Sequence, residues 1–299
     1  MRTSCLFPLV LSLLIWTVSP AQEGKESVRK AEQSAATVSD SDMQQSLDES
    51  IDDSLLRLEE MMVDAPSAKA TLDACESFMD HYGIRDDRAS YQKMADHWLT
   101  HTRIGEDFIL YHRLLIESVE KDAVIFTNAS EDSYPLLAMT VRGHEQKSVI
   151  PSYWISDPSF DPTLFAFNGF PQGEDIVTSI RMFADANPNR PIHLPLTMPH
   201  EVLEEFKDES VINGLSIALH ASGKAERNLR KTYHKLSVKR KDFDGSPLAS
   251  NFLPVLIAMH GIASSSGDDA VLNETSLWGK EILRDIGQPI TWEELTTGR

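Results

Sequence analysis

Residues 122–138 constrain the fold of this chain more than any other stretch. They begin with a short apolar run, 123–127, of the type that a buried parallel strand requires. A polar loop follows at 128–132, after which Ser133 can cap a helix and Pro135 fits its first turn. A strand, a polar loop and a helix start form the unit that opens a βαβ fold, so we expect an α/β domain to begin here.

The same alternation continues downstream. Further strands are predicted at 147–152, 192–197 and 215–220, with helices between them at 133–140, 175–186 and 198–206. Alternation of this kind predicts a mainly parallel, four-stranded, Rossmann-like sheet with helices on both faces and right-handed crossovers. The strand order does not follow from the pattern.

Helices are expected on both sides of this sheet. Residues 46–63 carry apolar side chains at helical spacing, residues 67–120 fit two further helices, and 246–287 fits a helical pair whose first helix is kinked at Pro254. The loop 156–173 is rich in proline and phenylalanine, which indicates either a functional loop or, as we favour, a flap over the core. The predicted α/β domain is 66–299, with its sheet core at 123–220.

The N-terminus predicts export. Arg2 precedes an apolar run at 6–18, and Ser19, Pro20 and Ala21 follow it, as in a secretory signal peptide that is cleaved near residue 22. An uncleaved membrane anchor is the alternative, although the run is short for a span. We therefore expect a signal peptide at 1–22 and a periplasmic or secreted product without an integral membrane span. Cys75 is then the one cysteine left, so no internal disulfide is possible.

Charge is distributed unevenly along the chain. The formal net charge is −18, which argues against nucleic acid as a partner. Residues 23–65 are acidic and lack aromatic side chains, so we expect a largely disordered tether. The basic cluster at 223–241 allows two interpretations, a solvated helix that pairs with this acidic segment or a patch for an anionic partner or membrane surface. Its members are Lys224, Arg227, Arg230, Lys231, Lys235, Lys239, Arg240 and Lys241.

The first strand and its loop also carry a family resemblance. The residues involved are Ile125, Phe126, Thr127, Asn128, Asp132, Tyr134, Pro135 and Leu136. They resemble the Ile-Leu-Phe-Thr-Asn-Gly-Asp-Asn-Asp-Thr-Tyr-Pro-Leu pattern in the soluble α/β region of large bacterial membrane proteins whose transmembrane part is like that of protein O-mannosyltransferases. Residues 191–198 resemble the family's Pro-Ile-Tyr-Phe-Ala strand, and 214–220 resemble the strand after it.

This resemblance covers roughly residues 105–222. It implies a soluble domain that stands alone and a loose connection to glycosylation in the bacterial cell envelope. Ala129, Ser130 and Glu131 depart from the family's Gly-Asp-Asn. The resemblance therefore does not carry a ligand site over to this chain.

Polar side chains follow the predicted strands, where ligands of open α/β sheets bind. Asn128, Ser130, Glu131 and Asp132 follow the first strand, Thr197 and His200 follow the third, and His220 ends the fourth. The ligand-binding candidates are Asn128, Glu131, Asp132 and His200. Two carboxylates with a histidine can perform acid–base chemistry or bind a cation, although helix capping and solvation are the favoured roles of Glu131 and Asp132. His193 lies inside a strand and is expected to be an interior histidine.

No standard catalytic motif is present. The sequence lacks a glycine-rich dinucleotide loop, a Walker loop, a nucleophile elbow and a His-Glu-x-x-His pair, so we expect neither a cofactor nor a resident metal. We favour an exported, non-enzymatic α/β binding or accessory module of the cell envelope, with an envelope protein or glycan as partner. The alternative is a hydrolase or transferase that uses Glu131, Asp132 and His200.

Overall fold

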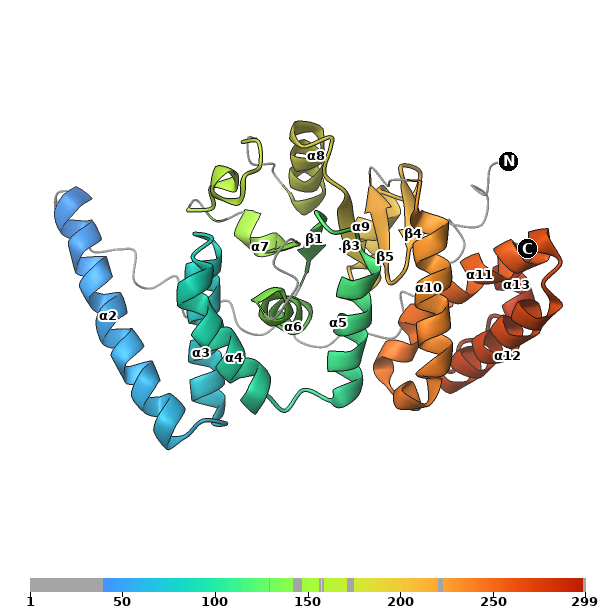
Figure 1. The fold of residues 1–299 in the computed structure, drawn as a ribbon, viewed down its shortest axis with the longest axis horizontal. Coiled ribbons are helices and arrows are strands. Elements are labelled where there is room, and N and C mark those ends of the chain that lie inside the picture. The colour runs from blue at the N-terminus through green and yellow to red at the C-terminus, as the bar shows by residue number, and fades with distance from the viewer. Residues whose placement is uncertain are drawn as a thin grey trace.

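The computed structural model describes residues 40–128, 130–141, 147–155, 157, 159–170, 175–219 and 223–297. The predicted signal peptide and the predicted tether up to residue 39 lie outside the described residues. The structure is 66% helical and contains one small five-stranded sheet. In Figure 1 the chain runs from α2 at one end, through the sheet, to α11, α12 and α13 at the other end.

The prediction of a mainly parallel, four-stranded, Rossmann-like sheet is wrong. The sheet is mixed and has the order β2-β1-β3-β5-β4. β1 is parallel to both β2 and β3, whereas β5 is antiparallel to β3 and to β4. The strands are β1 (Val124–Thr127), β2 (Ser148–Pro151), β3 (Ile192–Pro195), β4 (Ser210–Asn213) and β5 (Ser216–Leu219).

A tight hairpin explains the error. β4 was missed because it is only four residues long, has polar residues at both ends and exposes Val211. Gly214 follows with φ +64°, the left-handed conformation that a two-residue hairpin turn requires and that glycine adopts without strain. A Cβ at Gly214 would also lie only 2.5 Å from the side chain of Ser118. The chain therefore reverses at residue 214, and β5 runs against β3.

Residues 67–120 form three helices instead of the expected two, because the chain is extended at Thr102 and a new helix starts after Gly105. The other helices agree largely with the prediction. The expected helix at 46–63 lies within the longer α2. Asp175 caps α8 by accepting a hydrogen bond from the backbone N–H of Thr178. Pro254 lies in the first turn of α11, so the predicted kink is wrong. The α-helices are α2 (Asp40–Asp64), α3 (Lys69–Gly83), α4 (Arg88–His101), α5 (Glu106–Ser118), α6 (Ser130–Val141), α7 (Ser152–Ile155), α8 (Ile176–Ala186), α9 (His200–Glu205), α10 (Ala225–Val238), α11 (Leu253–Ser266), α12 (Asp269–Asp285) and α13 (Trp292–Thr297). The 3-10 helices are η2 (Pro162–Phe165), η3 (Arg240–Phe243) and η4 (Pro247–Phe252).

One partly buried carboxylate joins the N-terminal helices to the α/β unit. Asp80 of α3 accepts hydrogen bonds from the hydroxyls of Tyr134 (2.9 Å) and Tyr153 (2.7 Å) and from the indole of Trp154 (2.9 Å). Burial raises the pKa of Asp80 although these three donors lower it. The ring of Trp154 also packs where a Cβ on Gly83 would stand, 2.2 Å away. The Tyr-Pro segment after β1 therefore anchors α3.

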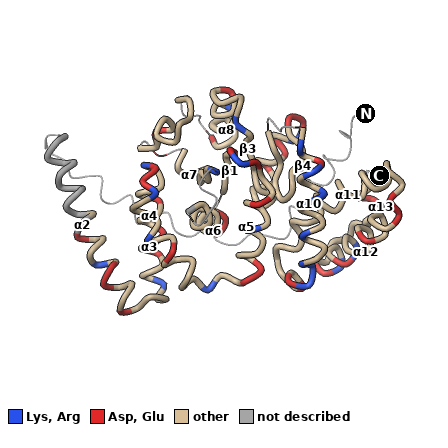
Figure 2. The backbone as a smooth tube through the Cα atoms, viewed as in Figure 1, with Lys and Arg blue, Asp and Glu red and all other residues tan. Residues whose placement is uncertain are grey.

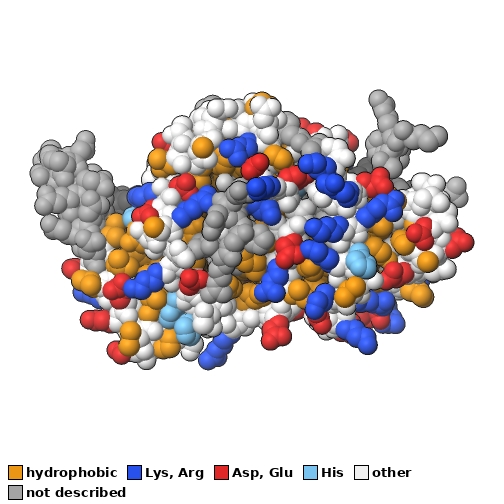
Figure 3. All heavy atoms as spheres, viewed as in Figure 1, with side chains coloured by type: hydrophobic (Ala, Val, Ile, Leu, Met, Phe, Trp, Pro, Cys, Tyr) orange, Lys and Arg blue, Asp and Glu red, His pale blue; other side chains and the backbone are white. Residues whose placement is uncertain are grey.

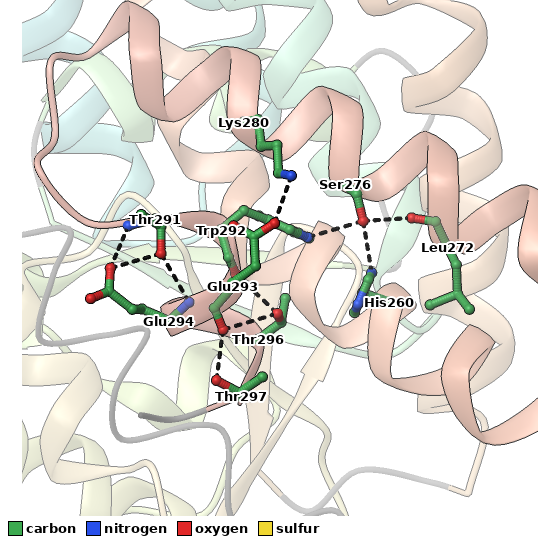
Figure 4. A network of polar contacts seen from close by, with 10 residues as sticks. All are labelled: His260, Leu272, Ser276, Lys280, Thr291, Trp292, Glu293, Glu294, Thr296 and Thr297. Carbon is green, nitrogen blue, oxygen red and sulfur yellow. Dashed lines mark hydrogen bonds and ion pairs between the residues drawn. The ribbon is translucent and has the colours of Figure 1, made fainter.

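The C-terminal helices are joined by a second polar network, which Figure 4 shows. The indole of Trp292 donates to Ser276 Oγ over 3.2 Å, and its ring fills the place of a side chain at Gly279. Thr291 and Glu294 form a capping box at the start of α13, with the carboxylate 2.7 Å from the backbone nitrogen of Thr291. The predicted helical pair at 246–287 is thus a three-helix unit.

The proline-rich loop packs on α8. Phe167 and Phe170 of this loop contact Phe183 edge to face, as expected for a flap over the core.

In the described part of the chain, 247–266 is the one helical segment long and apolar enough to span a membrane, and 56% of it is buried inside the protein.

Candidate functional site

The mixed sheet divides the predicted site residues between two edges. β1 and β3 are parallel, so Asn128 and the loop that contains Thr197 lie beyond the same edge. β5 is antiparallel to β3, so its carboxyl end lies at the opposite edge. His220 itself lies outside the described residues, but β5 points away from the predicted site.

Of the three ligand-binding candidates at the carboxyl edge of β1, Asp132 is buried and the other two are not. Asn128 and Glu131 are exposed, whereas the carboxylate of Asp132 lies 3.2 Å from Nε2 of the fully buried His112. The hydroxyls of Thr127 and Ser133 also bond to each other over 2.6 Å across this loop. Asp132 is therefore part of the junction between α5 and α6.

The hydrogen bonds of His112 fix how many protons the pair carries. Its Nδ1 lies 2.8 Å from the carbonyl oxygen of Phe108, which only accepts, so Nδ1 carries a proton. Contact between Nε2 and the Asp132 carboxyl then requires one further proton, on the ring or on the acid. The neighbouring Tyr111 is fully buried, and burial, reinforced by the Asp132 charge, raises its pKa well above the usual value. The Tyr111 hydroxyl has no partner among the described residues.

His200, the predicted histidine of the site, does not join the pair of Asp132 and His112. His200 begins α9, and the described residues give no hydrogen bond or ion pair between it and Glu131 or Asp132. The Nδ1 of His200 and the Oγ1 of Thr197 are both buried without a partner in the described part of the chain. The prediction that a ligand binds at this edge therefore stays a prediction.

A second acid–histidine pair joins β3 to the segment before β1 and was not predicted from the sequence. His193 is an interior histidine, as expected, and its Nε2 lies 2.5 Å from the carboxylate of Glu120. Its Nδ1 lies 2.8 Å from Ser216 Oγ, and that hydroxyl donates to the carbonyl oxygen of Asn213 over 2.9 Å. Since the serine proton is committed, Nδ1 must donate to Ser216, and the contact between Nε2 and the Glu120 carboxyl requires one further proton.

These contacts exclude a catalytic role for the cluster. Serine, histidine and a carboxylate stand in the order of a hydrolase triad, but Ser216 is fully buried and its hydroxyl points its proton at a backbone carbonyl. Burial raises the pKa of Glu120, yet the hydrogen bond and charge of His193 outweigh it, so the pKa lies below its ordinary value. The Asn213 amide also donates to this carboxylate over 3.1 Å. The cluster binds β3 and β5 to the segment before β1.

Exposed cations gather instead on one side of α10. Lys224, Arg227, Lys231 and Lys235 recur at three- and four-residue spacing and so lie on one stripe, which we call the basic face of α10. The first three are exposed and form no ion pair with another described residue, whereas Lys235 pairs with Glu117 of α5. Figures 2 and 3 show the concentration of Lys and Arg over α10 and the neighbouring strands.

Lys147 extends this basic face toward β2. It is half-buried, and its pKa is lowered by burial first; Lys231 and Lys235 lower it further, while Glu117 and Glu120 oppose the shift. The positive charges of Lys231 and Lys235 therefore act on Lys147, which belongs to the same basic surface. The basic cluster was predicted from the sequence, but the contribution of Lys147 was not.

The acidic N-terminal helix does not neutralise this face. α2 packs on α3 through Leu58, and its Glu59 pairs with Lys93 of α4 over 2.6 Å. Figure 1 shows α2 and α10 on opposite sides of the sheet. The described side chains of α2 therefore do not pair with the basic helix.

The predicted site does not coincide with the small surface pocket found among the described residues. Within the described residues, no three His, Cys, Asp or Glu side chains gather as metal ligands. A small surface pocket lies elsewhere, between the end of α3, the start of α4 and β2, and Arg88, Tyr91, Thr140 and Lys147 are among its lining residues. Asn128, Glu131, Asp132 and His200 do not line it.

Comparisons with other proteins do not extend these observations. No family model, no curated protein and no solved structure matches this chain. The resemblance of residues 105–222 to the soluble region of bacterial membrane proteins therefore stays a prediction from the sequence.

Proposed function

We propose that this chain is an exported, non-enzymatic binding module of the bacterial cell envelope, and that the basic face of α10 holds an anionic glycan chain. The observation that carries the proposal is the stripe of Lys224, Arg227 and Lys231, exposed and without ion pairs to other described residues. In a chain of formal charge −18, retaining uncompensated cations on one stripe favours an anionic partner.

The shape of the stripe favours an extended polyanion. Cations that recur about once per helical turn line up along α10, so a linear polymer with regularly spaced charges can meet them in sequence. The expected connection to envelope glycosylation selects a glycan over an acidic polypeptide. The envelope location and the export remain parts of this proposal, based on Arg2 and the apolar run at 6–18.

The alternative of a hydrolase or transferase receives less support. It requires Glu131, Asp132 and His200 to act on one substrate, but Asp132 contacts the buried His112 instead. Within the described residues, no hydrogen bond or ion pair links His200 to the two carboxylates. A binding role needs no such convergence.

Binding to matched polymers tests the proposal. Purified protein is measured against immobilised polygalacturonate, with neutral dextran and poly-L-glutamate as comparisons, at low and physiological salt. We expect binding to polygalacturonate that weakens with salt, weaker binding to polyglutamate and none to dextran. Since each cation near an anionic surface contributes about 1 kcal/mol, K224E/R227E/K231E should bind about a hundredfold less tightly.

A second triple variant controls for net charge. R57E/K69E/R284E changes the total charge equally, but its three exposed positions lie on α2, α3 and α12, outside the stripe. It should retain nearly full binding. Equal loss in the two triple variants would show a nonspecific charge effect and reject the basic face as the site. Preference for polyglutamate would reject the glycan as the partner.

A further inference from the structure

Two histidines stand one helical turn apart at the end of α4. His97 and His101 occupy positions i and i+4, which place their side chains on the same face of the helix. Their rings are stacked, with centroids 4.2 Å apart and planes inclined by 27°. Both residues are partly exposed, so solutes reach this face.

Backbone carbonyls fix the tautomer of each neutral ring. His97 Nε2 lies 2.8 Å from the carbonyl oxygen of Pro66, and His101 Nδ1 lies 3.0 Å from the carbonyl oxygen of His97. Because a carbonyl only accepts, these two nitrogens carry the protons. His97 Nδ1 and His101 Nε2 are left with lone pairs, and the hydrogen bonds recorded for the described residues give neither a partner.

We propose that His97 and His101 form a two-histidine site for a late first-row divalent metal ion, bound through these two nitrogens. Imidazole is a preferred ligand of Ni²⁺, Cu²⁺ and Zn²⁺, and Cu²⁺ binds most tightly in this series. Donation of the second ring N–H to a backbone carbonyl is the outer arrangement that orients metal-binding histidines. The site is independent of the proposed binding at α10.

The location favours a cation as well. His101 is the last residue of α4, and the carbonyl end of a helix carries a partial negative charge. Chelation requires the two lone pairs to converge through rotation about the χ2 bonds, which have broad energy minima, and the hydrogen bonds to the carbonyls of Pro66 and His97 limit this rotation. Since no third His, Cys, Asp or Glu joins them in the described part of the chain, water completes the coordination, and the ion exchanges readily.

Copper titration with spectroscopy tests this site. Purified protein is titrated with Cu²⁺, the affinity is measured by calorimetry, and the bound ion is examined by electron paramagnetic resonance. We expect one ion whose spectrum shows coupling to two imidazole nitrogens. His101→Ala should weaken binding at least about tenfold, since even the loss of an outer partner of a metal ligand costs that much.

Two controls separate chelation from other effects. His234→Ala removes an exposed histidine from α10 and should leave copper affinity unchanged. His97→Gln/His101→Gln keeps polar side chains on α4 and should abolish the two-nitrogen signal, while circular dichroism shows that its helices are retained. If copper affinity and the spectrum are unchanged in H101A or in the double Gln variant, the ring pair is only a structural stack and the proposal is overturned.

Discussion

In the interior of the sheet, Glu120 and His193 neutralise each other, whereas Arg227 and Lys231 on α10 are exposed without ion pairs to other described residues. Ser216 contacts the other ring nitrogen of His193, and the Asn213 amide donates to the Glu120 carboxylate. The polar groups of the interior pair are therefore used in holding the fold together. Buried charges must be paired because desolvation is costly, but exposed cations carry no such requirement. The difference indicates where to look for binding, which is on the surface whose charges the fold does not need.

Removing the interior carboxylate should have the largest effect on stability. Glu120→Ala breaks the buried pair and leaves Nε2 of His193 without its partner, which costs about 3–5 kcal/mol. Glu117→Ala breaks the more exposed pair with Lys235 and should cost less than about 1 kcal/mol. Urea denaturation of both variants measures the two values. Equal losses would show that the interior pair is not the structural element described above.

The carboxyl edge of β1 should respond less strongly. Asp132→Ala leaves the buried His112 without its partner, and such an orphaned group costs about 1–3 kcal/mol. Glu131→Ala, one residue earlier and exposed, is the control and should stay within about 0.5 kcal/mol. If thermal unfolding shows D132A to be more stable than the wild type, Asp132 is retained for a function at the expense of stability, and the predicted site regains support.

The basic face of α10 should contribute least to stability. K224E/R227E/K231E changes three exposed side chains that form no ion pair with described residues, so each change should shift the free energy of unfolding by no more than about 0.5 kcal/mol. Chemical denaturation of this variant beside the wild type gives the value. A loss comparable to that of E120A would mean that these cations hold the fold together, and the contrast between the two regions would disappear.

Local sequence patterns predicted most of the helices and four of the strands. Asp175 and Gly287 mark helix ends because capping and C-terminal glycine signals act within one turn. Thr291 and Glu294 carry a capping-box signal of the same local kind. Strand direction was not accessible in this way. The direction of β5 depends on four residues of β4 and on Gly214, which together create a hairpin where a crossover was expected.

The polar clusters could not be predicted for a different reason. Glu120 is 73 residues away from His193 in the sequence, and Ser216 is 23 residues away. The three side chains meet only when β3 lies between β1 and β5 in the folded sheet. Asp132 was correctly placed beside the end of β1, but its partner His112 comes from α5, and no spacing rule connects them. The basic face of α10 was accessible because its cations belong to one helix.

Hydrogen–deuterium exchange with and without polygalacturonate compares the two candidate regions in one measurement. The proposed function predicts that added polymer slows exchange in peptides from 224–241 and leaves those from 128–141 and 197–206 unchanged. Dextran should slow exchange in neither. Slowed exchange confined to 128–141 and 197–206 would contradict the account and place the binding site at the carboxyl edge of the sheet.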